Sequence, residues 1–328
     1  MTSTLVDQFG RKHDYMRIAV TDRCNLRCQY CMPEEGVSHL DHGKIMSYEE
    51  IEAIVQVAAS LGVRKIRLTG GEPLVRRDLE VLIEKIARIP EIEDISMTTN
   101  AVYLEERLQG LKDAGLNRVN ISLDSLRPER FRELTRGGDL DKVLRGIKAA
   151  IAIGLNPVKV NAVVIKGFND DEIENFIRWT IETPIQMRFI EYMPIGDSLT
   201  WKDGFFPLEQ VRQIAESIAP ITDVCDVRGN GPAEVFKLSG AAGTVGVIHP
   251  VSQHFCADCN RLRLTADGKL KPCLFWQKEI DIRPYIGDQQ ELIRVFKDVL
   301  NLKEEKHKMT EEQERDKRTI RKMSQIGG

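Results

Sequence analysis

Three cysteines near the start of the chain, Cys24, Cys28 and Cys31, are separated by three and then by two residues. Thiolate sulfur is the usual ligand of iron–sulfur clusters, and a cubane cluster takes one ligand per iron. A loop that supplies only three thiolates therefore leaves one iron free to bind a small molecule, as an open metal site does in catalysis. A zinc knuckle or three unrelated buried thiols are the alternatives that the spacing alone leaves open.

A second group of cysteines, Cys256, Cys259 and Cys273, lies near the other end of the chain with a different spacing. Three thiolates again favour a cluster with an open iron. His254 or His249 could instead supply a nitrogen ligand, so on spacing alone a zinc site with three cysteines and one histidine is an equal alternative.

The remaining cysteine and histidines have no partners in the sequence. Cys225 belongs to neither group and is predicted to be an ordinary buried or half-buried thiol. His13, His39, His42 and His307 are predicted to lie on the surface.

Composition limits the classes of protein to consider. A chain of 328 residues with 42% apolar residues can bury a large core, and its length suits one large domain with a smaller appendage. The 47 basic and 50 acidic residues give a net charge of −3, which calls for neither a nucleic acid nor an anionic membrane as partner. The sequence begins with no apolar leader and contains no run long enough to span a membrane, so we expect a cytoplasmic protein, where thiols stay reduced.

Short β-branched or apolar runs alternate with amphipathic stretches along most of the chain. Strands are expected at residues 16–20, 65–69, 95–98, 118–122, 158–164 and 185–190, and helices at 47–60, 78–89, 105–114, 140–153 and 170–180. Parallel strands need crossover connections, which are right-handed. The alternation therefore predicts an α/β fold, a partial (βα)6 barrel of the TIM type with its helices on the outer face.

The pattern weakens after residue 194. A turn signal at 229–232 places the predicted boundary between a barrel, residues 1–230, and a smaller C-terminal region, residues 231–328. A helix at 207–218, strands at 235–238, 243–248 and 261–265, a hairpin turn at 265–269 and a helix at 291–300 are expected. Residues 303–322 carry many charges of both signs and are predicted to be a solvated helix or a mobile tail.

The cysteine loop and a glycine motif follow the first two predicted strands. In barrels of this kind, the loops after the carboxyl ends of the strands build the active site. The first cysteine group follows one strand and Gly70-Gly71-Glu72-Pro73 follows the next, so both should face the same mouth. Glycine lets the backbone approach a ligand closely. A simple strand-to-helix turn is an equal alternative for this motif taken alone.

Several basic residues lie on predicted strands, where a free charge is unfavourable unless it faces a polar interior. They are Arg17, Arg67, Lys159, Arg188, Arg261 and Arg263. Arg261 and Arg263 are two positions apart and share one face of their strand, while Leu262 and Leu264 share the other. Arginine suits phosphate because its planar fork donates two parallel hydrogen bonds. Surface ion pairs are the alternative for any one of these residues.

These motifs resemble those of a known superfamily. The first cysteine group, together with Gly70-Gly71-Glu72-Pro73, resembles the radical S-adenosylmethionine (SAM) superfamily. The stretch from Cys259 to Phe275 and the terminal Ile326-Gly327-Gly328 resemble one branch of it, the GTP 3′,8-cyclase (MoaA-type) family of molybdenum cofactor biosynthesis. The resemblance covers essentially the whole chain, and two cysteine groups with the glycine motif between them are a specific signal.

The resemblance implies SAM and two 4Fe-4S clusters as cofactors and assigns residues to each. One cluster, on Cys24, Cys28 and Cys31, binds and cleaves SAM, and the other, on Cys256, Cys259 and Cys273, binds the guanine ring. The implied SAM contacts are Tyr30, Gly71, Ser122 and Met193. The implied GTP contacts are Arg17, Arg67, Thr98, Lys159, Arg261, Leu262 and Arg263, with Arg261 and Arg263 also counted as catalytic. The terminal glycines are expected to enter the barrel and to act in catalysis.

The implied reaction is a radical cyclisation. A 5′-deoxyadenosyl radical made from SAM removes hydrogen from C3′ of the GTP ribose, and the new radical adds to C8 of guanine. The product is (8S)-3′,8-cyclo-7,8-dihydroguanosine 5′-triphosphate, the first intermediate of molybdopterin biosynthesis. The resemblance further implies a flavodoxin- or ferredoxin-type electron donor and a downstream cyclic pyranopterin monophosphate synthase, and it is compatible with a homodimer.

Two other functions fit part of the sequence. A radical SAM peptide maturase also places an auxiliary cluster after the barrel, but such enzymes usually carry more C-terminal cysteines than the three found here. A non-catalytic binding module stabilised by zinc is the other alternative, and metal analysis distinguishes it from an enzyme with two iron–sulfur clusters.

Overall fold

The computed structural model describes residues 4–195, 201–225, 231–311, 314 and 317–327. Within these residues, twelve strands form one sheet in the order β12-β11-β10-β1-β2-β3-β4-β5-β6-β9-β8-β7. The strands are β1 (Tyr15–Ala19), β2 (Lys65–Thr69), β3 (Asp94–Thr99), β4 (Arg118–Ser122), β5 (Val158–Val164), β6 (Ile185–Glu191), β7 (Ile221–Asp223), β8 (Glu234–Leu238), β9 (Thr244–Ile248), β10 (Arg261–Leu264), β11 (Lys269–Lys271) and β12 (Ile280–Asp281). The predicted strands are confirmed to within one residue at each end.

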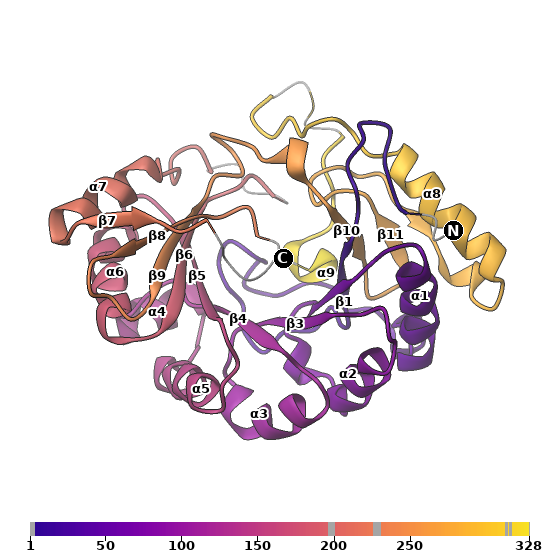
Figure 1. Cartoon of the computed structure of the whole chain (residues 1–328), viewed down its shortest axis with the longest axis horizontal. Coiled ribbons are helices and arrows are strands. Elements are labelled where there is room, and N and C mark those ends of the chain that lie inside the picture. Colours follow the sequence, from indigo (N-terminus) through magenta and orange to yellow (C-terminus); the bar gives the residue numbers. More distant parts are fainter. Residues whose placement is uncertain (1–3, 196–200, 226–230, 312–313, 315–316, 328) are drawn as a thin grey trace.

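The six predicted parallel strands, β1 to β6, are confirmed, and the C-terminal region extends this sheet on both sides. Strand β10 pairs in parallel with β1, and β9 pairs in parallel with β6. Strands β11 and β12 on one side and β8 and β7 on the other continue the sheet in antiparallel pairings. Figure 1 shows the strands curving into an open arc. The fold is thus a partial barrel of the radical SAM type.

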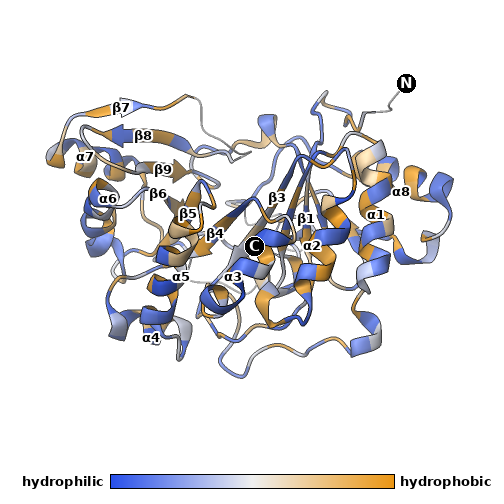
Figure 2. Cartoon of the chain, turned by 60° about the horizontal axis from the view of Figure 1, so that its bottom comes forward, coloured by the Kyte–Doolittle hydropathy of each residue, from blue (hydrophilic) through white to orange (hydrophobic). Residues whose placement is uncertain are grey.

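Helices cover the convex side of this arc (Figure 1). They are α1 (Tyr48–Ser60), α2 (Leu79–Ala87), α3 (Leu104–Asp113), α4 (Pro128–Thr135), α5 (Leu140–Ala152), α6 (Ile173–Glu182), α7 (Glu209–Ile218) and α8 (Gln289–Asn301), while the short α9 (Met323–Ile326) lies inside the curve. A capping box begins α1, because Ser47 Oγ accepts from Glu50 N and Glu50 Oε2 accepts from Ser47 N. Figure 2 shows hydrophobic and hydrophilic residues alternating along these helices.

Helix α4 was not predicted from the sequence. Its eight residues contain only two buried apolar side chains, Phe131 and Leu134. Two apolar residues are too few to define a helical period in the sequence. Pro128 at the start of the helix is the signal that could have indicated it, because proline is favoured in the first helical turn.

The strands separate an apolar layer from a polar lumen. Residues that face the helices are fully buried apolar side chains, among them Met16 and Ile18 on β1 and Ile66 and Leu68 on β2. The alternate positions, such as Arg17 and Arg67, face the lumen of the barrel. The period of two along each strand therefore places the hydrophobic core outside the barrel and the charged residues inside it.

The predicted boundary between residues 230 and 231 falls within a continuous sheet. Residues 226–230 lie outside the part of the chain that the structure describes, and these include the first half of the predicted turn at 229–232. Because β9 and β10 pair directly with the edges of the six-stranded core, the C-terminal region completes the barrel wall. The division of the chain at this point remains a prediction.

Several predictions about exposure are wrong. Among the described residues of 303–322, Lys303, Met309 and Thr319 are buried and Arg318 forms a β-bridge with Trp276, so this segment is not solvated throughout. Cys225 is exposed, because it follows the edge strand β7 and has no strand beyond it. His13 is buried against Asp7. In the described part of the chain, the helices are too short or too polar to cross a bilayer.

Candidate active site

A cavity of about 270 Å³ opens at the carboxyl ends of the parallel strands. It is lined by the whole first cysteine group and by residues from most of the strand ends. They include Tyr30, Thr69, Gly70, Gly71, Glu72, Thr98, Thr99, Asn100, Ser122, Asp124, Asn161, Val163, Arg188, Ile190 and Met193. The predicted convergence of the cysteine loop and the glycine motif on one mouth is therefore found in the structure.

Cys24, Cys28 and Cys31 are free thiols that line this cavity. Burial raises the pKa of Cys24 to about 11 and that of Cys31 to about 12, so without a metal these thiols stay protonated at neutral pH. A bound cation reverses this preference, because thiolate is the form that binds metal. Among the described residues, the lining contains no fourth cysteine and no histidine. Three thiols and an open fourth position fit a 4Fe-4S cluster that binds a small molecule.

Gly70 and Gly71 have a structural role in addition to lining the cavity. A Cβ atom on Gly70 would lie 2.3 Å from Thr21 O, and one on Gly71 would lie 2.2 Å from Arg23 O. Gly71 N donates to Thr21 O at 2.9 Å. The glycines are thus required by the backbone that leads into the cysteine loop, whereas the sequence suggested a role in approaching a ligand.

Glu72 joins the glycine motif to the end of β3. Its carboxylate accepts hydrogen bonds from Thr99 Oγ1 and Asn100 N, both at 2.7 Å. Asn100 in turn donates through Nδ2 to Asn25 Oδ1, 2.8 Å away in the cysteine loop. Burial raises the pKa of Glu72 to about 7, although these hydrogen bonds oppose the rise. Glu72 therefore couples the position of the cysteine loop to two strand ends.

Tyr30 is held over the cavity by a buried carboxyl group. Its hydroxyl donates to Asp124 Oδ2 at 2.8 Å, and Asp124 Oδ1 accepts from Val163 N at 2.8 Å. Burial raises the pKa of Asp124 to about 6. Ser122, Gly71 and Met193, the other residues that the resemblance assigns to SAM, line the same cavity.

Arginines dominate the inner wall of the barrel. Arg17, Arg67, Arg188, Arg261 and Arg263 all line the cavity. None of the five makes an ion pair with a carboxylate of the described residues. Arg17 Nε and Arg188 Nε are buried without any hydrogen-bond partner there. Buried cations without counter-ions are costly, so this wall is suited to bind a ligand with several negative charges.

The electrostatic cost appears in the pKa values of this wall. Burial, followed by repulsion from neighbouring arginines such as Arg17, lowers the pKa of Arg67 to about 9 even though Tyr15 opposes the shift. Burial and repulsion from Arg188 and Arg118 lower the pKa of Lys159 to about 6. Lys159 is buried in the barrel but does not line the described cavity.

The second cysteine group lies next to the cavity without lining it. Cys256, Cys259 and Cys273 are half-buried free thiols, and their neighbours Phe255 and Leu274 do line it. In the described part of the chain, no three His, Cys, Asp or Glu side chains are arranged to hold a single metal ion. The same is true of Cys24, Cys28 and Cys31, so this arrangement does not separate a cluster from the zinc site with His254 or His249.

The C-terminal segment enters the lumen. Arg263 Nη1 donates to the carbonyl of Gly327, and Met323 lines the cavity. Gly327 has a φ of +70°, and a Cβ atom there would lie 2.4 Å from Thr69 Cγ2. Gly328 is outside the described residues. The predicted insertion of the tail into the barrel is thus observed as far as Gly327.

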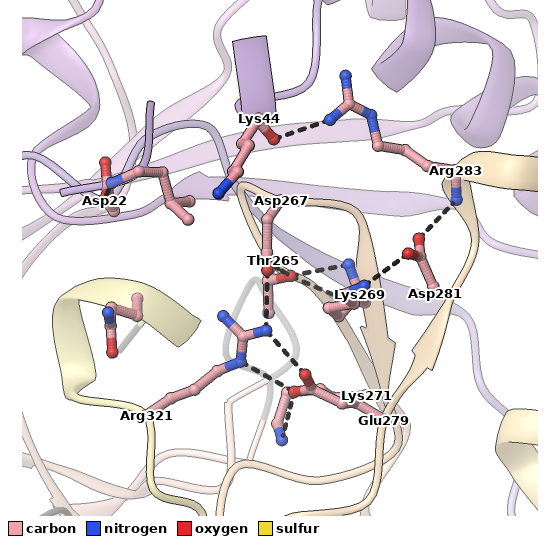
Figure 3. Close-up of polar contacts among 12 residues, drawn as sticks. Asp22, Lys44, Thr265, Asp267, Lys269, Lys271, Glu279, Asp281, Arg283 and Arg321 are labelled. Atoms are coloured by element: carbon pink, nitrogen blue, oxygen red, sulfur yellow. Dashed lines mark hydrogen bonds and ion pairs between the residues drawn. The ribbon is translucent and has the colours of Figure 1, made fainter. Parts of the chain in front are cut away.

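An ion-pair network holds this segment in place (Figure 3). Arg321 Nη2 bonds Asp267 Oδ2 at 2.9 Å and Glu279 Oε1 at 2.7 Å. Lys271 Nζ, which is fully buried, lies 3.2 Å from Glu279 Oε2. The hairpin of β10 and β11 therefore carries two of the cavity arginines, Arg261 and Arg263, and one carboxylate that anchors the tail, Asp267.

Leu262 is placed differently from the other residues assigned to GTP. Its side chain is buried in the core on the outer face of β10, as the alternation of that strand predicts. Leu262 pairs with Met16 of β1, and its side chain points away from the lumen. Reasoning from the sequence missed Tyr15, Asn161 and Phe255 as lining residues. Tyr15 and Asn161 share strand faces with Arg17 and Lys159, and that shared face is the signal that could have found them.

Comparison with known proteins gives a consistent assignment. The radical SAM superfamily matches residues 18–180, and the family described as Molybdenum Cofactor Synthesis C matches residues 185–309. The GTP 3′,8-cyclase of Listeria monocytogenes serotype 4b is 53% identical over 330 residues, covering 99% of each chain. That of Alkaliphilus metalliredigens is 50% identical over 325 residues, covering 98% of this chain and 99% of its own.

A solved structure shares the fold at much lower identity. The crystal structure of Streptococcus suis SuiB bound to S-adenosylmethionine superposes with a TM-score of 0.60 and 16% identity, over 90% of this chain and 68% of that one. Identity at this level supports the fold alone. The full-length relatives and both family matches show that this chain belongs to the GTP 3′,8-cyclase family of the radical SAM superfamily, whose members use SAM and two 4Fe-4S clusters.

Proposed function

We propose that this protein is an enzyme that converts GTP to (8S)-3′,8-cyclo-7,8-dihydroguanosine 5′-triphosphate, the first step of molybdenum cofactor biosynthesis. The observation that carries the proposal is a set of arginines that line the same cavity as the first cysteine group and form no ion pair with the described residues: Arg17, Arg67, Arg188, Arg261 and Arg263. A triphosphate supplies the missing negative charges.

The proposed cluster ligands are Cys24, Cys28 and Cys31 for one centre and Cys256, Cys259 and Cys273 for the other. When bound, the first cluster and SAM supply a 5′-deoxyadenosyl radical that removes hydrogen from the ribose. Tyr30, Gly71, Ser122 and Met193 would contact SAM, because all four line the cavity around the first cysteine group. The chain itself binds, orients and shields the reactants, since no side chain has to act as a nucleophile.

The lumen offers polar atoms that could orient the nucleotide. Thr98 Oγ1 and Asn161 Oδ1 are buried without partners in the described part of the chain, and both residues line the cavity. Arg17 Nε and Arg188 Nε are available in the same way. We assign Arg17, Arg67, Arg261 and Arg263 to the triphosphate of GTP. Thr98 is assigned to GTP as well. Lys159, which is buried outside the lining, would act through its charge, and Leu262 would act through its backbone.

The proposed reaction implies two partner proteins and a cellular compartment. The first cluster must be reduced before each turnover, so we infer a low-potential donor of the flavodoxin or ferredoxin type. The cyclic nucleotide requires an enzyme that rearranges it further, a cyclic pyranopterin monophosphate synthase. The cytoplasm suits seven free cysteines, because thiols there remain available to iron.

Anaerobic reconstitution tests the proposed function. The protein, loaded with iron and sulfide, is incubated with SAM, a reductant and GTP, and the nucleotides are analysed by mass spectrometry. We expect 5′-deoxyadenosine together with a nucleotide that has the mass of GTP and a different retention time. The Arg17→Ala variant should retain its clusters and lose most of the cyclised product. SAM cleavage by the parent protein without any new nucleotide would contradict the assignment of GTP as substrate.

A further inference from the structure

Lys303 occupies an unusual position for a lysine. It lies directly after α8, in the charged segment that the sequence suggested would be solvated, yet it is only 3% exposed. Lysine is almost never fully buried unless its ammonium group is paired. The partners of Lys303 Nζ therefore indicate why the residue is buried.

Lys303 Nζ contacts the strand and loop segments that carry two of the three C-terminal cysteines. It donates to Pro272 O at 2.7 Å, to Arg261 O at 3.0 Å and to Cys259 Sγ at 3.5 Å. Pro272 immediately precedes Cys273 in the chain. One ammonium group thus fixes the thiol of Cys259 and the backbone next to Cys273.

Within the described residues, no carboxylate neutralises the charge of Lys303. No ion pair joins this residue to an acidic side chain in the described part of the chain. His13, which is nearby, is neutral at physiological pH, because burial and the charge of Lys303 lower its pKa to about 4. The sulfur of Cys259 is the group within hydrogen-bond distance that can carry a negative charge.

Arg11 contacts the backbone of the third cysteine, Cys256. Its Nη1 donates to Cys256 O and Glu305 O, both at 2.8 Å, and its Nη2 donates to Glu304 O at 2.9 Å. Asp7 orients the guanidinium group through an ion pair of 2.6 Å. The N-terminal turn therefore ties the loop of Cys256 to the segment that begins with Lys303.

We propose that Lys303 and Arg11 are positioning residues for the second iron–sulfur cluster, and that the ammonium group of Lys303 sets the reduction potential of that cluster through its hydrogen bond to Cys259. Hydrogen bonds to cluster sulfurs and nearby positive charge stabilise the reduced cluster, which carries the additional electron. Lys303 therefore makes the potential of the second cluster less negative. The inference rests on the proposed ligation by Cys256, Cys259 and Cys273, and it does not depend on the identity of the nucleotide.

The test measures the cluster in the full-length chain. The variant Lys303→Met keeps the length of the side chain and removes its charge and its N–H groups. It is combined with Cys24→Ala, Cys28→Ala and Cys31→Ala, so that the second cluster alone is reconstituted, and the potential is measured by a redox titration followed by electron paramagnetic resonance. We expect a shift to a more negative potential relative to the same background with Lys303 intact. Lys306→Met, an exposed residue of the same segment, is the matched control and should leave the potential unchanged.

Iron and sulfide content provides a second readout, in chains with all six cluster cysteines. Loss of the second cluster from Lys303→Met, with the first cluster and the far-UV circular dichroism retained, also supports a positioning role. If Lys303→Met does not fold, Arg11→Gln makes the test, and we expect it to lose second-cluster iron. A chain that keeps both the iron content and the potential of the parent after either substitution would overturn the proposal. Absence of iron from the second site in the parent would instead overturn the ligation on which it rests.

Discussion

Arg17 on β1 is the register partner of Arg263 on β10, two residues from opposite ends of the chain. Arg17 is also the register partner of Arg67 on β2. Three arginines therefore lie side by side on three adjacent parallel strands, whose spacing is about 4.8 Å. Like charges this close repel one another, so the arrangement is favourable only when an anion binds.

The first prediction concerns GTP binding by this row. Replacing Arg263 with Gln should raise the dissociation constant for GTP about 10- to 100-fold, since a hydrogen bond to a charged group contributes roughly 1.5–3 kcal/mol. Isothermal titration with GTP and with SAM checks this, and SAM affinity should be unchanged. Arg88→Gln is the control, because Arg88 is an exposed residue that directly follows α2. Equal losses for both ligands would indicate a general loss of structure and count against a phosphate-binding role.

The second prediction concerns stability without ligand. Replacing Arg67 with Met removes a buried charge that burial and neighbouring arginines destabilise. The melting temperature of the unliganded chain should therefore rise by about 2 °C, which corresponds to roughly 1 kcal/mol. The stabilisation that GTP gives to the parent protein should at the same time become smaller. Thermal unfolding with and without GTP measures both effects, and a lower melting temperature in the unliganded variant would contradict this account of the row.

The third prediction concerns protons. Lys159 has a pKa of about 6 in the folded chain, so it is mostly neutral at pH 7.5, whereas in the unfolded chain it is charged up to a pKa of about 10.5. The unfolded state binds more protons, and the contribution of Lys159 makes stability rise with pH between about 6 and 10.5. A bound triphosphate should restore the charge of Lys159. GTP binding at pH 7.5 should thus take up about one proton.

Calorimetry in buffers of different ionisation enthalpy measures this uptake. Lys159→Met should bind GTP without the proton and should show a weaker rise of stability with pH over the same range. A binding enthalpy that does not depend on the buffer in the parent protein would show that Lys159 keeps one protonation state throughout.

Much of this architecture can be predicted from the sequence, for physical reasons that differ between regions. The strands β1 to β6 can be predicted because short apolar or β-branched runs, such as the one that contains Ile66 and Leu68, alternate with amphipathic stretches. The burial of Lys303 and the anchoring of Arg321 could not be predicted, because their partners are carbonyls and carboxylates that only the fold brings close. The same holds for the pairing of β10 with β1, which is a contact between segments distant in sequence.

The fourth prediction concerns the tail. In Gly327→Ala the new methyl group would meet Thr69 Cγ2 at 2.4 Å, and the positive φ of this residue disfavours alanine as well. The segment should leave the lumen, and GTP cyclisation should fall severely while cluster content stays intact. Adding Thr69→Ser removes the clashing methyl group and should restore part of the activity. Full activity in Gly327→Ala, or in a chain that lacks residues 327 and 328, would show that the inserted segment has no role in catalysis.

The most direct test of the central claim follows one hydrogen atom. GTP that carries deuterium at C3′ is incubated anaerobically with the reduced, reconstituted protein and SAM, and the 5′-deoxyadenosine is analysed by mass spectrometry. If the cavity between the first cysteine group and the arginine row binds SAM and GTP together, one deuterium should appear in the 5′-deoxyadenosine, and the cyclised nucleotide should have lost it. Formation of 5′-deoxyadenosine without deuterium, with GTP recovered unchanged, would contradict the account.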